Sequence, residues 1–255
     1  MISKQKIELV RSLAHKKGRE EARMFVAEGE KIVFDLLKTK LKLVALYFTA
    51  DGAALLKGFP DPAKIELLTA KEMERLSAFK TPSNILAIFE IPSYQEVESP
   101  VFEGLTLVLD GLQDPGNLGT IIRLADWFGI GQIFCSENCV DCYNPKCIQS
   151  TMGAIARVRV DYVDLPTLLK EAWKQSIPVY GTFMEGENLY QTELPSHGLV
   201  VMGSEGKGIS PELSAYLTKK ISIPAFPEGN RELESLNVAV SAAIVCAEFR
   251  RRIKT

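Results

Sequence analysis

The segment Leu105–Gly129, LTLVLDGLQDPGNLGTIIRLADWFG, decides the fold of this 255-residue chain. It predicts an apolar strand over residues 105–109, a turn rich in Gly, Asp and Pro over 110–116, and a helix that Gly129 closes. The turn thus joins the carboxyl end of a strand to the amino end of a helix, where open α/β sheets bind ligands. Arg123 lies within the apolar run of this helix. A guanidinium buried among core residues is costly unless it is paired or faces a site.

Strand and helix patterns alternate along the whole chain, which predicts an α/β fold. Before residue 91 we expect strands at 24–27, 43–49, 65–68 and 84–90, and helices at 3–14, 28–38, from 51, and from the capping-box pair Thr69 and Glu72. After residue 104 we expect strands at 105–109, 131–135, 158–161, 178–183, 199–202 and 220–223, and helices at 117–128, 165–175, 211–217 and 236–251. The proline-containing stretch 93–103 indicates a linker between a domain over 1–92 and a second over 104–255.

Composition excludes several classes of protein. The chain is 46% hydrophobic and 24% charged, and it has no apolar run near the ~18–20 residues that span a membrane. The basic start lacks the apolar core of a secretory signal, and five cysteines suit a reducing cytosol better than a disulfide framework. These features predict a cytoplasmic protein without a membrane anchor. Two histidines are too few for a three-histidine metal site within one chain.

Three motifs, widely separated in the sequence, follow one another in order. The second is glycine-rich and follows an apolar strand, but it lacks both the G-x-G-x-x-G spacing of dinucleotide sites and the Lys-Ser/Thr ending of a P-loop. On its own it would predict only a turn. The three motifs are Asn117-x-Gly119-x3-Arg123, Gly203-x-Glu205-Gly206-x-Gly208 and Ser235-Leu236-Asn237-Val238.

Taken together, the motifs resemble those of the SpoU (TrmH) family, which are S-adenosyl-L-methionine-dependent RNA 2′-O-ribose methyltransferases of the SPOUT class. The resemblance covers residues 104–250. It implies a homodimer that modifies rRNA or tRNA, with a SPOUT α/β domain over 104–255 that contains a deep trefoil knot. It also implies that residues 1–92 form a smaller, RNA substrate-binding α/β domain similar to ribosomal protein L30e.

The resemblance also assigns residues to the site. Its catalytic set is Arg123, Asn117, Glu205, Ser235 and Asn237. Its cofactor-binding set is Thr182, Met202, Gly203, Glu205, Gly206, Gly208, Ile223, Pro224, Leu236, Asn237 and Val238.

The chemistry of Arg123 favours a phosphate-binding role. A guanidinium with a pKa above ~12 is a poor base, so we expect Arg123 to bind the phosphate beside the target ribose while a phosphate oxygen or water accepts the proton. Asn117 and Ser235 would position Arg123 or the ribose, Glu205 would anchor the arginine, and Asn237 would hold its loop.

The charge distribution adds a candidate RNA surface. The net charge is −2, yet residues 1–42 carry 11 Lys/Arg against 6 Asp/Glu, a local charge of +5. We expect RNA contacts from Lys16, Lys17, Arg19 and Arg23. The alternative is a solvated helix face with Lys/Glu pairs.

Three further interpretations of the sequence are disfavoured. Cys135-x3-Cys139-x2-Cys142 has the spacing of a cluster-binding motif, and Cys147 follows, but Cys135 ends a predicted strand in mid-domain, so we expect incidental thiols and no metal. A non-catalytic RNA-binding protein is disfavoured by the complete motif set. A Rossmann-type nucleotide enzyme is disfavoured by the missing G-x-G-x-x-G.

Overall fold

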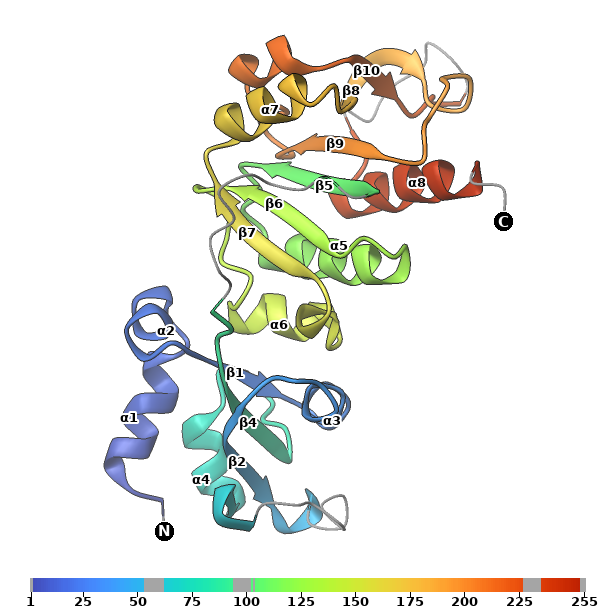
Figure 1. Cartoon of the computed structure of the whole chain (residues 1–255). Helices are drawn as coiled ribbons and strands as arrows, with labels where there is room; N and C mark the ends of the chain where they lie inside the picture. The colour runs from blue at the N-terminus through green and yellow to red at the C-terminus, as the bar shows by residue number, and fades with distance from the viewer. Residues whose placement is uncertain (1, 53–61, 94–101, 103, 227–234, 253–255) are drawn as a thin grey trace. The chain divides into compact units, whose positions relative to one another are not determined.

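A computed structural model describes residues 2–52, 62–93, 102, 104–226 and 235–252 (Figure 1). The chain forms two compact units. The N-terminal unit comprises Met1–Gln95 and Asp141–Ala156, and the C-terminal unit comprises Glu96–Val140 and Arg157–Thr255. Most of the expected helix from residue 51, most of the linker and loop residues 227–234 lie outside the described residues.

The N-terminal unit is built on a four-stranded mixed sheet with the order β1-β4-β2-β3. Strand β4 pairs antiparallel with β1 and β2, and β3 pairs parallel with β2. Its elements are α1 (Lys4–Ser12), α2 (Lys16–Ala22), β1 (Met24–Glu28), α3 (Glu30–Leu37), β2 (Leu43–Thr49), η2 (Pro62–Lys64), β3 (Ile65–Leu68), α4 (Ala70–Leu76), β4 (Ile85–Glu90), α6 (Pro145–Thr151) and η3 (Ala154–Ala156).

Local sequence chemistry fixes the ends of these helices. The capping box predicted for α4 is present: Thr69 Oγ1 accepts a hydrogen bond from the Glu72 backbone N–H at 3.3 Å, and Glu72 Oε2 accepts one from the Thr69 N–H at 3.0 Å. Helices α2 and α6 were not expected from the sequence. Helix α6 begins with Asn144 as its cap, and the Tyr143 ring beside it packs 5.0 Å from that of Phe25. Residues 141–156 thus complete the core of the N-terminal unit.

Arg19 occupies the interior of the N-terminal unit, although the sequence predicts it on an RNA-binding surface. Only 2% of the residue is exposed. Its guanidinium donates to Asp141 Oδ2 from Nε at 2.7 Å and to the Leu13 carbonyl from Nη1 at 2.8 Å. Burial and pairing satisfy the charge inside the protein, so Arg19 is not part of an RNA-facing surface.

The C-terminal unit contains a six-stranded parallel sheet with the order β10-β8-β9-β5-β6-β7, which confirms the predicted α/β class. The segment predicted as a helix over 211–217 is a 3-10 helix instead. The elements are β5 (Leu105–Asp110), α5 (Pro115–Trp127), β6 (Gln132–Ser136), β7 (Arg159–Val163), α7 (Leu165–Lys174), β8 (Val179–Asn188), β9 (Gly198–Gly203), η4 (Pro211–Tyr216), β10 (Lys219–Ser222) and α8 (Val238–Arg251).

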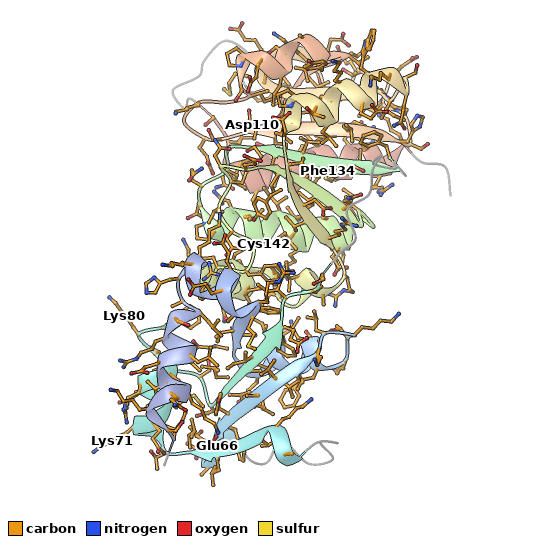
Figure 2. All side chains as sticks on the ribbon, turned by 60° about the vertical axis from the view of Figure 1, so that its left-hand side comes forward. Glu66, Lys71, Lys80, Asp110, Phe134 and Cys142 are labelled. Carbon is orange, nitrogen blue, oxygen red and sulfur yellow. The ribbon has the colours of Figure 1, made fainter. Side chains whose placement is uncertain are left out.

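Helices cover both faces of this sheet. Val179 of β8 faces a core cluster that includes Leu169 of α7 and Leu213 of η4, and Phe134 belongs to the same cluster (Figure 2). The next residue, Tyr180, points to the opposite face, where its ring packs edge-on against Phe249 of α8 with centroids 5.3 Å apart. Helix α5 packs beside α8. This alternation explains why the central strands are apolar almost throughout.

The strand order brings the first two predicted motifs to one edge of the sheet. They follow β5 and β9, which are neighbours, and the loop after β8 lies beside them because β9 also pairs with β8. Asp110, the buried last residue of β5, accepts a hydrogen bond from the Ser210 N–H at 2.6 Å and so ties β5 to the glycine-rich loop after β9. No helix among the described residues is long and apolar enough to cross a membrane.

Candidate functional site

The glycine-rich loop after β9 folds back on itself. An added Cβ on Gly203 would lie 2.0 Å from the carbonyl carbon of Gly208, so no side chain fits at this position. Gly208 has a φ of +66°, in the left-handed region that favours glycine, and its N–H donates to the Ser204 carbonyl at 2.9 Å. The glycines therefore permit a tight turn whose backbone forms one wall of a cavity.

A wide bulge in β8 forms the opposite wall. Lys220 of β10 pairs with Gly181, but the next residue, Ile221, pairs with Glu187. Residues 182–186 therefore bulge away from the ladder, and four of them line the cavity.

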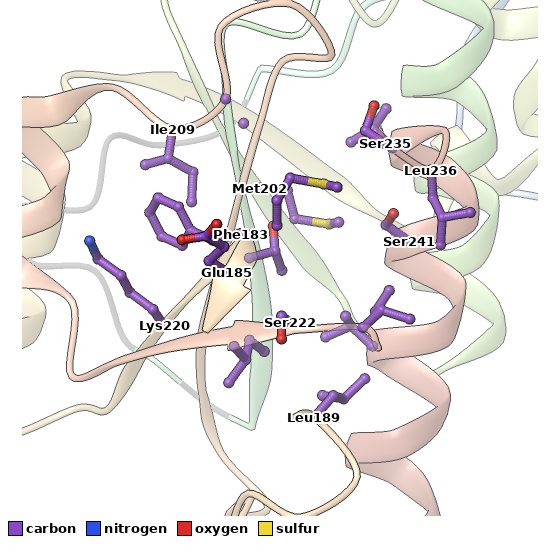
Figure 3. A pocket seen from close by; sticks show the side chains of 18 of the residues that line it. Phe183, Glu185, Leu189, Met202, Ile209, Lys220, Ser222, Ser235, Leu236 and Ser241 are labelled. Carbon is purple, nitrogen blue, oxygen red and sulfur yellow. The ribbon is translucent and has the colours of Figure 1, made fainter. Parts of the chain in front are cut away.

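The cavity between these walls has a volume of about 1050 Å³ (Figure 3). Its lining comes from β8, β9, β10, the loops that follow them and the part of α8 up to Val245. Gly206 and Asn237 do not line it, whereas Ser235 does. The predicted cofactor-binding residues that line the cavity are Thr182, Met202, Gly203, Glu205, Gly208, Ile223, Pro224, Leu236 and Val238.

The lining is suited to a nucleoside-sized ligand with an apolar ring. Side chains such as Met202, Ile223 and Val245 supply apolar surface. Two hydroxyls are already used inside the protein, because Thr182 Oγ1 donates to the Val201 carbonyl and Ser222 Oγ donates to the Gly186 carbonyl. Polar groups at the lining that could contact a ligand are the backbone of the loops, the serine hydroxyls and the charged side chains, among them Ser235, Ser241 and Glu205.

Sequence reasoning missed part of the lining. The cavity also contains Glu185 and Lys220, and Lys220 Nζ lies 4.8 Å from the centroid of the Phe183 ring. Leu189 and Val245 close its apolar side. The bulge of β8 against β10 places the missed β8 residues in the lining. No local pattern in the sequence predicts this bulge.

A chain of side-chain hydrogen bonds joins all three motifs beside the cavity. Asn237 caps α8, because its Oδ1 accepts from the N–H groups of Ala239 and Val240 at 3.0 and 3.3 Å. Its Nδ2 must then point away from the helix, and it donates to Asn117 Oδ1 at 3.0 Å. The Nδ2 of Asn117 in turn donates to Glu205 Oε1.

Comparison with known proteins agrees with this arrangement. Residues 104–247 match the SpoU rRNA Methylase family, and residues 4–87 match the MRM3-like substrate binding domain. The chain belongs to the SpoU rRNA methylase family. The matched region contains all three motifs.

Individual relatives match along nearly the whole chain. The 23S rRNA (guanosine(2553)-2′-O)-methyltransferase RlmP of Bacillus subtilis is 30% identical and is matched over 96% of each chain. A TrmH-family structure from Porphyromonas gingivalis has 41% identity and a TM-score of 0.86, covering 99% of this chain and 100% of its own. An AdoMet-bound rRNA methyltransferase from Sinorhizobium meliloti has 25% identity and a TM-score of 0.84, covering 100% and 97%. These likenesses confirm the predicted SpoU fold; the knot stays a prediction.

Arg123 of the first SpoU motif differs from the sequence-based expectation in two ways. Its side chain is exposed, because Leu118, Ile121 and Ala125 point into the core and Arg123 lies on another side of α5. Among the described residues it has no hydrogen-bond or ion-pair partner, so the expected contact with Glu205 is absent and Glu205 binds Asn117 instead. Arg123 does not line the cavity. Its guanidinium is therefore free to bind an external anion.

The cysteine-rich segment supports the β5–α5 loop of the SpoU domain. The Cys139 thiol accepts a hydrogen bond from the Leu112 N–H at 3.2 Å, and Ser136 Oγ accepts one from the Gly111 N–H at 2.8 Å. Hydrogen bonding by Cys135 contributes most to lowering the pKa of the Cys139 thiol to about 6, against the effect of burial. Across the described ranges no group of three His, Cys, Asp or Glu residues could hold a metal ion. The absence of metal stays a prediction for elemental analysis.

Proposed function

We propose that this SpoU-family chain transfers the methyl group of S-adenosyl-L-methionine to a ribose 2′-hydroxyl of RNA. The carrying observation is the hydrogen-bonded chain Asn237–Asn117–Glu205, which joins the three motifs beside a cavity suited to a nucleoside. When bound, the cofactor supplies an electrophilic methyl group on a sulfonium centre. The protein must align the ribose hydroxyl with that group and assist the departure of the hydroxyl proton.

The cavity residues would bind and orient the cofactor. Apolar contact would come from Ile223, Leu236 and Val238, and backbone contacts from the loop that begins at Gly203. The Glu205 carboxylate lies at the cavity wall, where a negative charge favours a cationic ligand. The hydrogen bond to Asn117 fixes the orientation of this carboxylate.

Arg123 would act on the RNA. Its free, exposed guanidinium fits a phosphate next to the target ribose, to which it can donate two parallel hydrogen bonds. Asn117 and Ser235 would position the ribose at the mouth of the cavity. The proton acceptor would then be a phosphate oxygen or water, because an arginine remains protonated.

The N-terminal unit would bind the RNA substrate. Residues 4–87 match the MRM3-like substrate binding domain, and the relatives that extend over this part, including the Bacillus subtilis protein and human mitochondrial rRNA methyltransferase 3, act on rRNA by name. Lys16 and Lys17 remain exposed, although each lies 3.8 Å from a glutamate one helical turn away. We therefore favour rRNA over tRNA as the substrate.

We also propose a homodimer in the cytoplasm. Trp127 of α5 is 84% exposed and Val240 of the neighbouring α8 is 49% exposed, so two packed helices present large apolar side chains to solvent. None of the five cysteines forms a disulfide, as a reducing compartment favours. Light scattering should give twice the chain mass of 28.2 kDa, and Trp127→Glu should shift the protein toward the monomer.

Transfer of a tritiated methyl group tests the function directly. The substrates are rRNA and tRNA from a strain that lacks the gene, and rRNA from the parent strain serves as the premodified control. We expect label only in rRNA from the deletion strain, at a linkage that resists alkaline hydrolysis because its 2′-oxygen is blocked. Label at an alkali-labile linkage would indicate base methylation and would contradict the ribose assignment.

Calorimetric titrations separate the competing interpretations. The enzyme should bind S-adenosylmethionine and not NAD, whereas a Rossmann-type enzyme would show the reverse. RNA binding without cofactor binding or methyl transfer would identify a non-catalytic RNA-binding protein.

A further inference from the structure

One guanidinium joins the end of α8 to the turn that follows β8. Arg252 Nη1 donates to the Thr192 carbonyl at 2.6 Å, and Nη2 donates to the carbonyls of Tyr190 and Leu189 at 2.8 and 3.3 Å. The planar fork of an arginine can serve several acceptors at once, which an ammonium group cannot do with the same geometry. A single side chain therefore holds three carbonyls of the turn over residues 189–192, whose N–H groups are bonded to Asn188 and Ser222.

Glu248 orients this guanidinium from one helical turn earlier. Its Oε1 accepts from Arg252 Nε at 2.8 Å, and the glutamate is only 6% exposed. Arg251 also binds the carboxylate, and hydrogen bonds from Arg251 and Arg252 lower the pKa of Glu248 to about 2 despite its burial. Of the two arginines Arg252 alone bonds the turn, since the side-chain contacts of Arg251 within the described part of the chain are with Glu248.

The turn holds a cavity residue between two elements. Leu189 is fully buried, its N–H donates to the Ser222 carbonyl of β10 at 2.9 Å, and its side chain lines the cavity (Figure 3). Val245, less than one turn before Glu248 on α8, lines the same cavity. We call Arg252 and the three carbonyls that it binds the clamp. Helix α8, which ends at the clamp, thus also provides part of the cavity wall.

We propose that Arg252, oriented by Glu248, is a positioning residue that sets cofactor affinity through Leu189. Arg252 does not line the cavity, so its effect is transmitted by the three carbonyls that it holds. The inference rests on the proposed function, in which this cavity binds S-adenosylmethionine. Losing Arg252 would leave the turn with its bonds to Asn188 and Ser222 and would let the Leu189 side chain shift within the cavity wall.

The test compares Arg252→Ala and Arg252→Lys with the wild type, using calorimetric titration with S-adenosylhomocysteine and steady-state methyl transfer. We expect Arg252→Ala to raise the Kd for S-adenosylhomocysteine and the KM for S-adenosylmethionine about tenfold, the effect of losing charge-assisted hydrogen bonds. The kcat at saturating cofactor and the Kd for RNA should stay near wild type. A general loss of folding would not produce this split. The Lys variant retains the charge beside Glu248 but cannot hold three carbonyls, so its affinity should lie closer to that of the Ala variant.

Arg251→Ala is the matched control. Arg251 binds the same carboxylate, its side chain is 67% exposed, and its contacts do not include the turn. This variant should keep the wild-type Kd and KM. If Arg251→Ala lost as much cofactor affinity as Arg252→Ala, the loss would come from the unpaired charge of Glu248. That result would contradict the role proposed for the bonds between Arg252 and the turn.

The outcomes also separate this inference from the proposed function. Wild-type protein that binds no S-adenosylhomocysteine would contradict the proposed cofactor site itself. If the wild type binds and Arg252→Lys binds equally well, the cofactor site stands and the clamp is refuted, even if Arg252→Ala fails to fold.

Discussion

Asn237 donates its side-chain N–H to Asn117 Oδ1 at 3.0 Å, and this bond couples the cap of α8 to the first turn of α5. The direction of the bond is fixed from the helix side, because Asn237 Oδ1 already accepts from two backbone N–H groups. Asn117 can therefore present only its N–H group to Glu205. A structural cap thus determines how a carboxylate is held at the cavity wall.

Asn117→Asp should lower turnover about tenfold or more, because it removes a donor and places a second negative charge beside Glu205. The measurement is kcat for methyl transfer with both substrates saturating. Thr120→Ala is the control on the same helix, since Thr120 Oγ1 bonds only the carbonyl of Gly116. Wild-type turnover in Asn117→Asp would show that the hydrogen-bonded chain has no part in the reaction.

Arg123→Ala should reduce kcat/KM for RNA roughly a hundredfold, about 3 kcal/mol, while the Kd for S-adenosylmethionine changes by less than about twofold. The split is expected because Arg123 is exposed and lies outside the cavity lining. Arg157→Ala is a suitable control. Arg157 is a surface arginine, and it is paired with Asp126, which lies on α5 as Arg123 does. Turnover near wild type in Arg123→Ala would refute its role toward RNA.

Gly203→Ala should abolish cofactor binding, whereas Gly206→Ala in the same loop should bind cofactor normally. An added Cβ at Gly203 would lie 2.0 Å from backbone atoms of Gly208, so the turn must open. An added Cβ at Gly206 meets nothing within 4 Å. Titration with S-adenosylhomocysteine measures the difference. Equal affinities would mean that the tight turn does not shape the pocket.

Local chemistry explains which parts of the structure the sequence could predict. The capping box at Thr69 and the tight turn at Gly203 depend on neighbours within a few residues, and each is present. The predicted strands of both units are likewise confirmed, because their runs of apolar residues reflect burial on the sheet. The first two motifs meet because β5 and β9 are neighbours in the sheet, and the third joins them through the hydrogen bond from Asn237 to Asn117.

Contacts between distant residues explain what the sequence could not predict. Arg19 pairs with Asp141, which is 122 residues away, and Arg252 holds carbonyls 60 to 63 residues away. No periodic pattern records such pairs, so the sequence places Arg19 on the RNA-binding surface and does not predict the bonds of Arg252. The expectation that Arg123 is buried is wrong for a different reason. The helical positions of Leu118, Ile121 and Ala125 already place Arg123 outside the core.

Arg19→Ala should destabilise the protein by about 3 kcal/mol, because it leaves the Asp141 carboxylate and the buried Leu13 carbonyl without this donor. Lys16→Ala and Lys17→Ala should each change stability by no more than about 0.5 kcal/mol, since their ion pairs are exposed. Urea unfolding gives the values. RNA affinity should fall in the two lysine variants and change little in folded Arg19→Ala. A larger loss of RNA affinity in folded Arg19→Ala would show that Arg19 contacts RNA.

The stabilising effect of Glu248 should depend on pH in the acid range. Hydrogen bonds from Arg251 and Arg252 lower the pKa of this carboxyl in the folded chain from 4.5 to about 2. A carboxyl whose pKa is lowered on folding stabilises the protein fully above its unfolded pKa and loses that effect as pH falls through its folded pKa. The difference in Tm between wild type and Glu248→Gln should therefore be constant above about pH 5 and shrink between about pH 4.5 and pH 2. Glu212→Gln is the control, since Glu212 is exposed at the start of η4 and has no hydrogen bond or ion pair among the described residues, so its effect on Tm should not change over this range. A difference for Glu248→Gln that stays constant down to pH 2 would show that ionisation of Glu248 does not contribute to the stability of the α8 end.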